Sequence, residues 1–151
     1  VGSKIRFDFG NNSSATLQIR NLRVTNVNPI STTLEQLDGI YQIGTAADLK
    51  ELSDFVAKGA TGVKAALTAD IDMAGVEMAP IGSKATPFSG SLNGQGHKIS
   101  NLVINMPEAE YVGLVGAITG DSEVRNLVLD ATCSFTGKAF MGIIGGATGV
   151  L

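Results

Sequence analysis

Apolar and polar residues alternate along much of the chain with a period of two, which is the spacing of strands buried on one face. Between residues 67 and 73 one side of the predicted strand is apolar, and the other side carries Asp70 and Asp72. Further short alternating stretches follow residue 88, separated by glycine turns such as residues 93–96. This pattern predicts a mainly β fold of short strands and tight turns.

Residues 45–58 are the one stretch whose apolar spacing fits a helix. Thr45 is a suitable N-cap, and Asp48 three residues later completes a near capping box. Lys58 and Gly59 follow as a favourable C-terminal charge and a left-handed cap. Four apolar residues then share one face of the predicted helix: Leu49, Leu52, Phe55 and Val56.

The first 28 residues form a separate prediction. Two alternating stretches flank a polar turn at residues 10–14, which predicts a β-hairpin over residues 1–28, and a connector follows over residues 29–44. This hairpin resembles the last two strands of a carbohydrate-binding jelly roll. Residues 19–24 also repeat a pattern found later in the chain, so two alternatives stay open: the hairpin belongs to the later repeat, or to a different sheet.

Two short patterns repeat in the second half of the chain. Residues 99–104 match residues 124–129, and residues 113–116 (Gly-Leu-Val-Gly) match residues 142–145 (Gly-Ile-Ile-Gly). Repeats of this length are typical of one coil of a β-solenoid. The repeated positions are two asparagines and four glycines: Asn101, Asn126, Gly113, Gly116, Gly142 and Gly145.

These repeated residues predict how successive coils stack. Asn101 and Asn126 are expected to adopt left-handed bends, because asparagine tolerates that conformation better than most residues. In stacked coils the two amides would then form a ladder, one above the other. The paired glycines would let the backbone turn where two coils lie close together.

The Gly-Leu-Val-Gly run of residues 113–116, with the patterns around residues 45–49, 67–72, 80–82 and 93–97, resembles the GLUG repeats of bacterial surface proteins. Such repeats occur in large adhesins and in immunoglobulin-cleaving metallopeptidases, outside their catalytic part. The resemblance covers roughly residues 40–149 and implies a right-handed parallel β-helix whose first coil is covered by a helix. The second copy has Ile143 in place of leucine, a change that packing tolerates.

Composition and charge exclude several classes of function. The net charge of −3 and the lack of a basic run exclude sequence-independent nucleic-acid binding, which needs clustered Lys and Arg. No apolar run reaches the roughly 18 residues of a membrane-spanning helix. The single Cys133 and single His97 exclude a Cys2His2 zinc site.

Three residues are candidate ligand-binding positions. Asp70 and Asp72 project from one side of a strand, where they could bind Ca²⁺ or act on a sugar; alternatively they are simply the solvated face that alternation requires. Tyr111 follows two acidic residues and could form a sugar platform, or it could pack inward. His97 has no acid partner that the local sequence places beside it, so no catalytic set is predicted.

These observations together predict a mainly β protein: a short right-handed parallel β-helix over residues 45–151, with an N-terminal capping helix and a preceding hairpin. We expect a non-catalytic extracellular or cell-surface module of a larger bacterial protein, without a cofactor. Its expected partners are flanking domains, neighbouring subunits, extracellular glycans or a host surface. Two alternatives stay open: a glycan-binding or polysaccharide-degrading module, and a subunit that assembles by strand addition.

Overall fold

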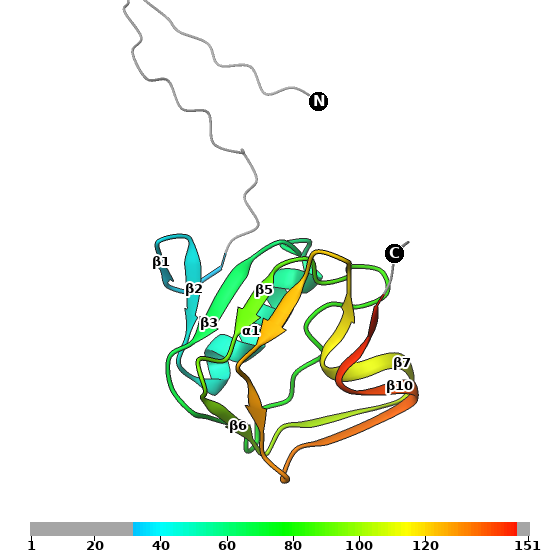
Figure 1. The fold of residues 1–151 in the computed structure, drawn as a ribbon. Coiled ribbons are helices and arrows are strands. Elements are labelled where there is room, and N and C mark those ends of the chain that lie inside the picture. Colours follow the sequence, from blue (N-terminus) through cyan, green and yellow to red (C-terminus); the bar gives the residue numbers. More distant parts are fainter. Residues whose placement is uncertain (1–31, 148–151) are drawn as a thin grey trace, which may run out of the picture.

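The computed structural model describes residues 32–147, which form a mainly β fold with mostly parallel strands and one helix (Figure 1). The mainly β class that the alternating sequence predicts is therefore confirmed. The expected hairpin of residues 1–28 lies outside the described residues. The elements follow in this order: β1 (Gln36–Leu37), β2 (Ile40–Ile43), α1 (Ala46–Ala57), β3 (Lys64–Leu67), β4 (Ile71–Asp72), β5 (Ser91–Asn93), β6 (Lys98–Ser100), β7 (Val103–Ile118), β8 (Glu123–Arg125), β9 (Val128–Leu129) and β10 (Ser134–Ala147).

The helix α1 begins where its sequence predicts, because Thr45 and Asp48 cap its first turn. The Thr45 hydroxyl accepts a hydrogen bond from the Asp48 N–H at 3.1 Å, and the Asp48 carboxylate accepts one from the Thr45 N–H at 2.9 Å. This reciprocal pair satisfies N–H groups at the helix start. The four apolar residues that the spacing places on one face are all buried: Leu49, Leu52, Phe55 and Val56.

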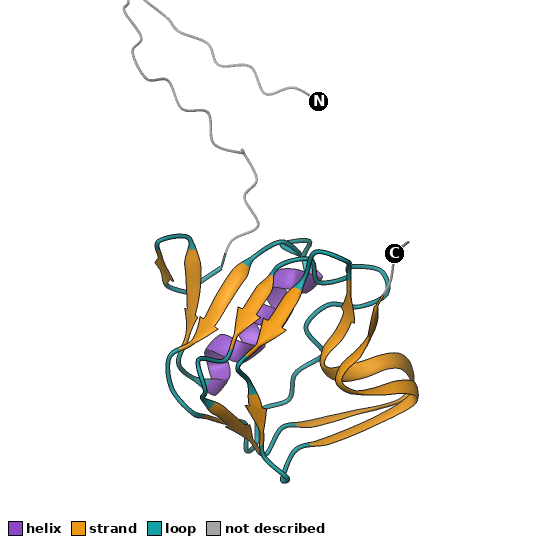
Figure 2. Cartoon of the chain, viewed as in Figure 1, coloured by secondary structure: helices purple, strands orange, loops and turns teal. Residues whose placement is uncertain are grey.

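Three sheets contain the parallel strands. In the first sheet β2, β3, β5 and β8 are parallel neighbours, and the antiparallel β1 lies at the free edge of β2. The second sheet contains β4, β6 and β9, and the third contains β7 and β10. Between β5 and its neighbour β8, the chain therefore passes through both other sheets. Figure 2 shows α1 behind the strands of the first sheet.

Residues 36–43, expected to belong to a connector, instead contain β1 and β2. Asp38 and Gly39 join these strands with φ angles of 49° and 79°. Two consecutive positive φ angles are what a tight two-residue hairpin needs, and an Asp-Gly pair provides them at low cost. The Asp-Gly pair was thus the signal in the sequence that a hairpin starts here.

Asn101 and Asn126 each form a corner between two strands, with φ angles of 56° and 50°. The predicted left-handed bends are confirmed, but the predicted ladder between the two amides is wrong. Asn101 follows β6, and its Nδ2 donates to Asp72 at 2.8 Å. Asn126 follows β8, and its Nδ2 lies 3.3 Å from Oδ1 of Asn93. The same short sequence pattern therefore occurs at two different corners of the fold. The number of residues between Asn101 and Asn126 is not the length of one coil.

The two glycine-containing runs do lie side by side. In the parallel β7–β10 pair, Gly142 is opposite Gly113 and Ile144 is opposite Val115. Figure 1 shows β7 and β10 following each other along their whole curved path. The number of residues from Gly113 to Gly142 therefore corresponds to the step from β7 to its parallel neighbour β10.

The core lies between the three sheets and α1. Each sheet contributes side chains with no exposed surface, among them Leu92 of β5, Ile99 of β6 and Leu114 of β7. Phe88, in the loop before β5, is also completely buried. Burial of apolar side chains such as these is the main source of stability for a fold of short strands.

Candidate functional site

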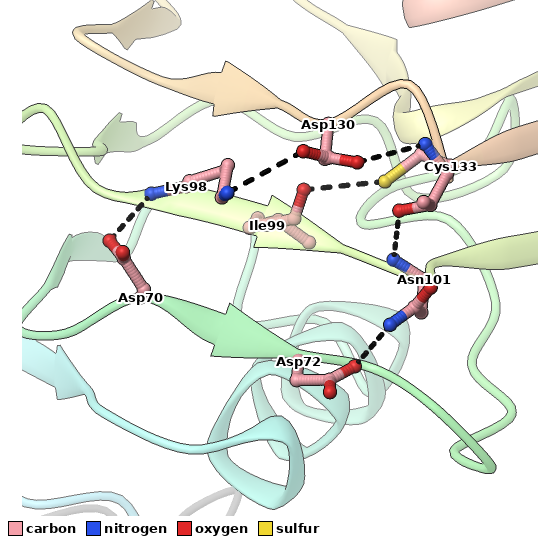
Figure 3. A network of polar contacts seen from close by, with 8 residues as sticks. Asp70, Asp72, Lys98, Ile99, Asn101, Asp130 and Cys133 are labelled. Carbon is pink, nitrogen blue, oxygen red and sulfur yellow. Dashed lines mark hydrogen bonds and ion pairs between the residues drawn. The ribbon is translucent and has the colours of Figure 1, made fainter.

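Asp70 lies in the turn between β3 and β4, and its carboxylate reaches toward β6 (Figure 3). Its Oδ1 accepts a hydrogen bond from the Lys98 N–H at 3.0 Å and lies 3.2 Å from Nδ1 of His97. The Lys98 N–H, followed by the His97 ring, holds the pKa of Asp70 below its ordinary value. Asp70 thereby links two neighbouring turns of the chain.

Asp72 makes an equivalent link one position beyond the buried Ile71. Its Oδ1 accepts hydrogen bonds from Nδ2 of Asn101 at 2.8 Å and from the Ala74 N–H at 3.0 Å. The Asn101 amide and then the Ala74 N–H lower the pKa of this carboxyl. Asp70 and Asp72 are both exposed while Ile71 is buried, as the alternating pattern predicts.

Asp130 is a third aspartate of this group, and the sequence analysis missed it. Its Oδ1 accepts the Thr132 N–H at 3.1 Å, and its Oδ2 lies 3.5 Å from Nζ of Lys98 (Figure 3). The Thr132 N–H is the main cause that lowers the pKa of Asp130. Asp130 follows β9 directly, just as Asp72 ends β4, and this shared position at a strand end was the available signal.

The aspartates Asp70, Asp72 and Asp130 accompany the sheet of β4, β6 and β9, and each accepts hydrogen bonds from nearby donors. Within residues 32–147, no three His, Cys, Asp or Glu side chains gather closely enough to hold a metal ion. The chemistry that this row offers is hydrogen-bond acceptance and negative charge. Its clearest use is to hold neighbouring turns of the chain in register.

Tyr111 does not join the aspartates, because it belongs to β7 in another sheet. Its half-buried ring stacks on Phe140 of β10, with the ring centroids 5.0 Å apart and the planes inclined by 13°. Tyr111 also lines an apolar pocket of about 370 Å³ together with Pro80, Met106 and Val112. The aromatic ring is thus engaged in packing between neighbouring strands.

Cys133 and His97 both lie beside the row of aspartates. The Sγ atom of the half-buried Cys133 lies 3.4 Å from the carbonyl oxygen of Ile99, and its N–H donates to the Asp130 carbonyl oxygen at 3.0 Å. His97 follows a tight turn and contacts Asp70, a partner 27 residues away that local sequence does not reveal. Both residues therefore take part in contacts between distant turns of the chain.

A polar groove of about 450 Å³ crosses the outer face of the first sheet. Small residues of β3 and β5 form its floor, and four charged residues line it: Lys64, Asp121, Glu123 and Arg125. Arg125 Nε lies 3.7 Å from a Glu123 carboxylate oxygen. The groove was not predicted, because it requires three strands from distant parts of the sequence to lie side by side.

We expect the thermal unfolding midpoint to fall when the pH drops below about 4, the usual range of aspartate titration. Asp70, Asp72 and Asp130 have pKa values lowered by the folded structure. Their stabilising contribution is therefore present above the unfolded pKa and is lost as the pH falls through the folded pKa. In Asp72→Asn, the midpoint should be lower at pH 7 and should fall less steeply in acid.

The measurement is the unfolding midpoint followed by circular dichroism from pH 7 to pH 2. Asp121→Asn is the matched control, because the exposed Asp121 makes no hydrogen bond or ion pair with other described residues. An acid dependence that is identical in Asp72→Asn and the unchanged chain would contradict the proposed role of Asp72.

The comparisons with known proteins return partial matches to long chains. The chain is 37% identical over 92 residues to a protein of Evansella cellulosilytica named provisionally as a Gly-rich membrane protein; the match covers 59% of this chain and 11% of the relative. It is 34% identical over 114 residues to halomucin of Haloquadratum walsbyi, covering 72% of this chain and 1% of halomucin. The chain thus spans a small part of both relatives. No family model and no solved structure matches it, so membership of the GLUG family stays a prediction.

Among the described residues, α1 is too short to cross a bilayer, and no helix there has the required length and apolar character.

Proposed function

We propose that this chain is a short right-handed parallel β-helix that acts as a non-catalytic module of a larger cell-surface protein. The order of the strands supports the β-helix. β5, β6 and β7 lie in three different sheets, and β8, β9 and β10 then pair with them in the same order and direction. Each passage through the three sheets would be one coil, and α1 would cover the first coil.

The hydrogen bonds of the candidate site residues are the observation that supports a non-catalytic role. The carboxylates of Asp70, Asp72 and Asp130 all accept hydrogen bonds from other turns or from the adjacent backbone. Their pKa values are lowered, which keeps them ionised and suits acceptors of hydrogen bonds. A general acid would need the opposite shift, toward a raised pKa.

The relatives support the location. One of them is named as a membrane protein, and both are much longer than the matched region. A module that repeats a simple coil suits a spacer or stalk in such a chain, because each coil needs contacts only with its neighbours. We therefore propose that the coils hold other parts of the protein away from the cell or present them to the surroundings.

Glycan binding is the second candidate function, and the polar groove of the first sheet favours it. Lys64, Asn93 and Arg125 offer hydrogen-bond donors along a groove floored by small residues. Polar side chains of this kind could bind the hydroxyl groups of a sugar chain. Within residues 32–147, no aromatic side chain lines this groove, so the apolar face of a sugar would find little to stack on.

The test of the first proposal uses intact cells that produce the full-length protein. An antibody against residues 32–147 should label the cells before lysis, and protease added outside should remove the signal. Labelling that requires lysis would refute the surface location.

The test of the second candidate uses the purified chain on a glycan array and in an assay for new reducing ends on polysaccharides. We expect no binding and no cleavage. Binding that Arg125→Ala abolishes and Lys138→Ala retains, at equal thermal stability, would replace the spacer role with a glycan-binding role. Lys138 is the matched control, because it lies on β10 and not in the groove.

A further inference from the structure

The strands β8, β9 and β10 form an open edge at one end of the fold. Each of them is the last strand in its sheet and has a parallel neighbour on one side only within the described residues. Figure 1 shows β10 on the outside of β7, near the end of the described chain. Unpaired edges of parallel strands present backbone N–H and C=O groups that can bind another strand.

The side chains of β10 at this edge are apolar, like those opposite them on the preceding strand β7, but they are much more exposed. Val112 and Val115 of β7 have no exposed surface, whereas Met141 and Ile144, opposite them on β10, are 55% and 37% exposed. The apolar row that is core in β7 thus continues on β10 without a cover. Exposed apolar surface of this kind marks an interaction site.

The glycines of the two strands give an independent observation. A Cβ added at Gly113 would overlap the carbonyl oxygen of Gly142, so the close approach of β10 requires glycine there. A Cβ at Gly145 would lie 2.6 Å from the carbonyl oxygen of Gly116, so the preceding strand requires that glycine. Gly113, the first glycine of its run, thus faces the following strand β10, and Gly145, the last glycine of its run, faces the preceding strand β7. Gly116, the last glycine of the first run, faces the preceding loop in the same way, because its added Cβ would lie 2.5 Å from the Gly82 carbonyl oxygen.

Gly142 is the exception, because nothing in the described structure requires a glycine at this position. Its φ is not positive, and an added Cβ would have the Ile144 carbonyl oxygen as its nearest neighbour, at 3.3 Å. A strand stacked on β10 as β10 is stacked on β7 would give Gly142 the surroundings that Gly113 has now. The glycine pattern therefore matches a partner strand beyond β10.

We propose that the edge of β8, β9 and β10 docks one further coil in the same parallel register, and that Gly142 is the residue that admits it. The proposal rests on the β-helix proposed above and not on its cell-surface location. According to this proposal, the flanking element packs directly on the module and shares its core. A flanking domain joined only by a flexible linker would not do so.

The existing β7–β10 contact argues for a coil over a second copy of this chain. A further coil would continue that contact with the same strand direction and the same glycine pairing. A second copy stacked head to tail would bring the β2 edge of its first sheet to β8, and β1 already occupies that edge in antiparallel orientation. A second copy related by a two-fold axis would pair β10 antiparallel with itself and lose this register.

The test adds the missing coil to the full chain, by inserting a second copy of residues 119–147 directly before Thr148. We expect the unfolding midpoint to rise by about 5 °C or more. We expect amide hydrogen exchange in residues 140–147 of the first copy to slow about tenfold or more. An insert of the same composition in scrambled order is the control, and it should change neither quantity.

Gly142→Ala separates docking from local stability. In the unextended chain it should shift the midpoint by less than about 2 °C, since the nearest atom to its Cβ would be the Ile144 carbonyl oxygen at 3.3 Å, which a small adjustment relieves. In the extended chain, the same change in the first copy should abolish the gain in stability and protection. An equal effect of Gly142→Ala in both chains, or no protection of β10 by the added coil, would overturn the proposal.

Two measurements on the unextended chain test for other occupants of the β8–β9–β10 edge, namely a second copy of the chain or residues 1–31. Protection of β10 that rises with protein concentration, together with sedimentation as a dimer, would overturn the proposal in favour of a second copy. Protection that disappears when residues 1–31 are deleted would overturn it in favour of that segment. A monomer with fast exchange in residues 140–147, whether or not residues 1–31 are present, supports a coil as the occupant.

Discussion

Replacing Gly90 with alanine is expected to destabilise the fold by about 3 kcal/mol or more, the upper end of what overpacking a tight site costs. The added Cβ would overlap the carbonyl oxygen of Val63 and lie 2.8 Å from its carbonyl carbon. Val63 cannot easily move aside, because its carbonyl oxygen accepts the Ser91 N–H at 3.0 Å and so joins β5 to the preceding turn. The strain therefore falls on the backbone that connects two neighbouring strands.

Urea unfolding followed by circular dichroism measures this effect. Gly120→Ala is the matched control, because an added Cβ there has no atom within 4 Å and the φ of Gly120 is not positive. This control should leave the stability unchanged or raise it by up to about 1 kcal/mol, through a less flexible unfolded chain. Similar losses in both variants would show that close approach at Gly90 is not what requires glycine.

Truncating Phe88 to alanine should cost about 3–5 kcal/mol, the range measured for large aromatic residues removed from a core. Phe88 has no exposed surface, and its backbone is fixed by hydrogen bonds with Ala117 and Thr119 at 2.8 and 2.9 Å. Because the neighbouring strands hold the backbone in place, the site should collapse little and leave a cavity. Phe88→Leu should cost less, since it fills part of the space.

Phe140→Ala is the control for this prediction. The Phe140 ring is largely exposed on β10 and stacks only against Tyr111 among the described aromatic rings. Its removal should cost no more than about 1 kcal/mol, which is typical of an aromatic pair without much burial. The unfolding free energy from urea titration decides the outcome, and equal losses at Phe88 and Phe140 would contradict the burial argument.

Local features of the fold could be predicted from the sequence, because local rules decide them. Thr45 and Asp48 cap α1 through bonds only three residues apart, and Asn101 bends through its own backbone preference. The outward direction of Asp70 and Asp72 follows from the period of the strand. Each of these predictions needs a window of fewer than about ten residues, the range over which such patterns act.

Pairings between distant residues could not be predicted in the same way. Asn101 was expected over Asn126, because both occur in the same short pattern, but each amide has a different partner. The partners of Asp70 are 27 and 28 residues away, and nothing near Asp70 in the sequence indicates which residues they are. The groove beside Arg125 and the ion pair of Asp130 with Lys98 depend on the same long-range register.

The order of the strands has a consequence for synthesis. In the first sheet, apart from the β1–β2 hairpin, each strand pairs in parallel with one made earlier: β3 with β2, β5 with β3, and β8 with β5. Since a ribosome delivers the N-terminal part first, α1 and β2 are available before any later strand emerges. Each new strand of this sheet therefore meets a finished template, so the sheet can grow in one direction while the chain is still being translated.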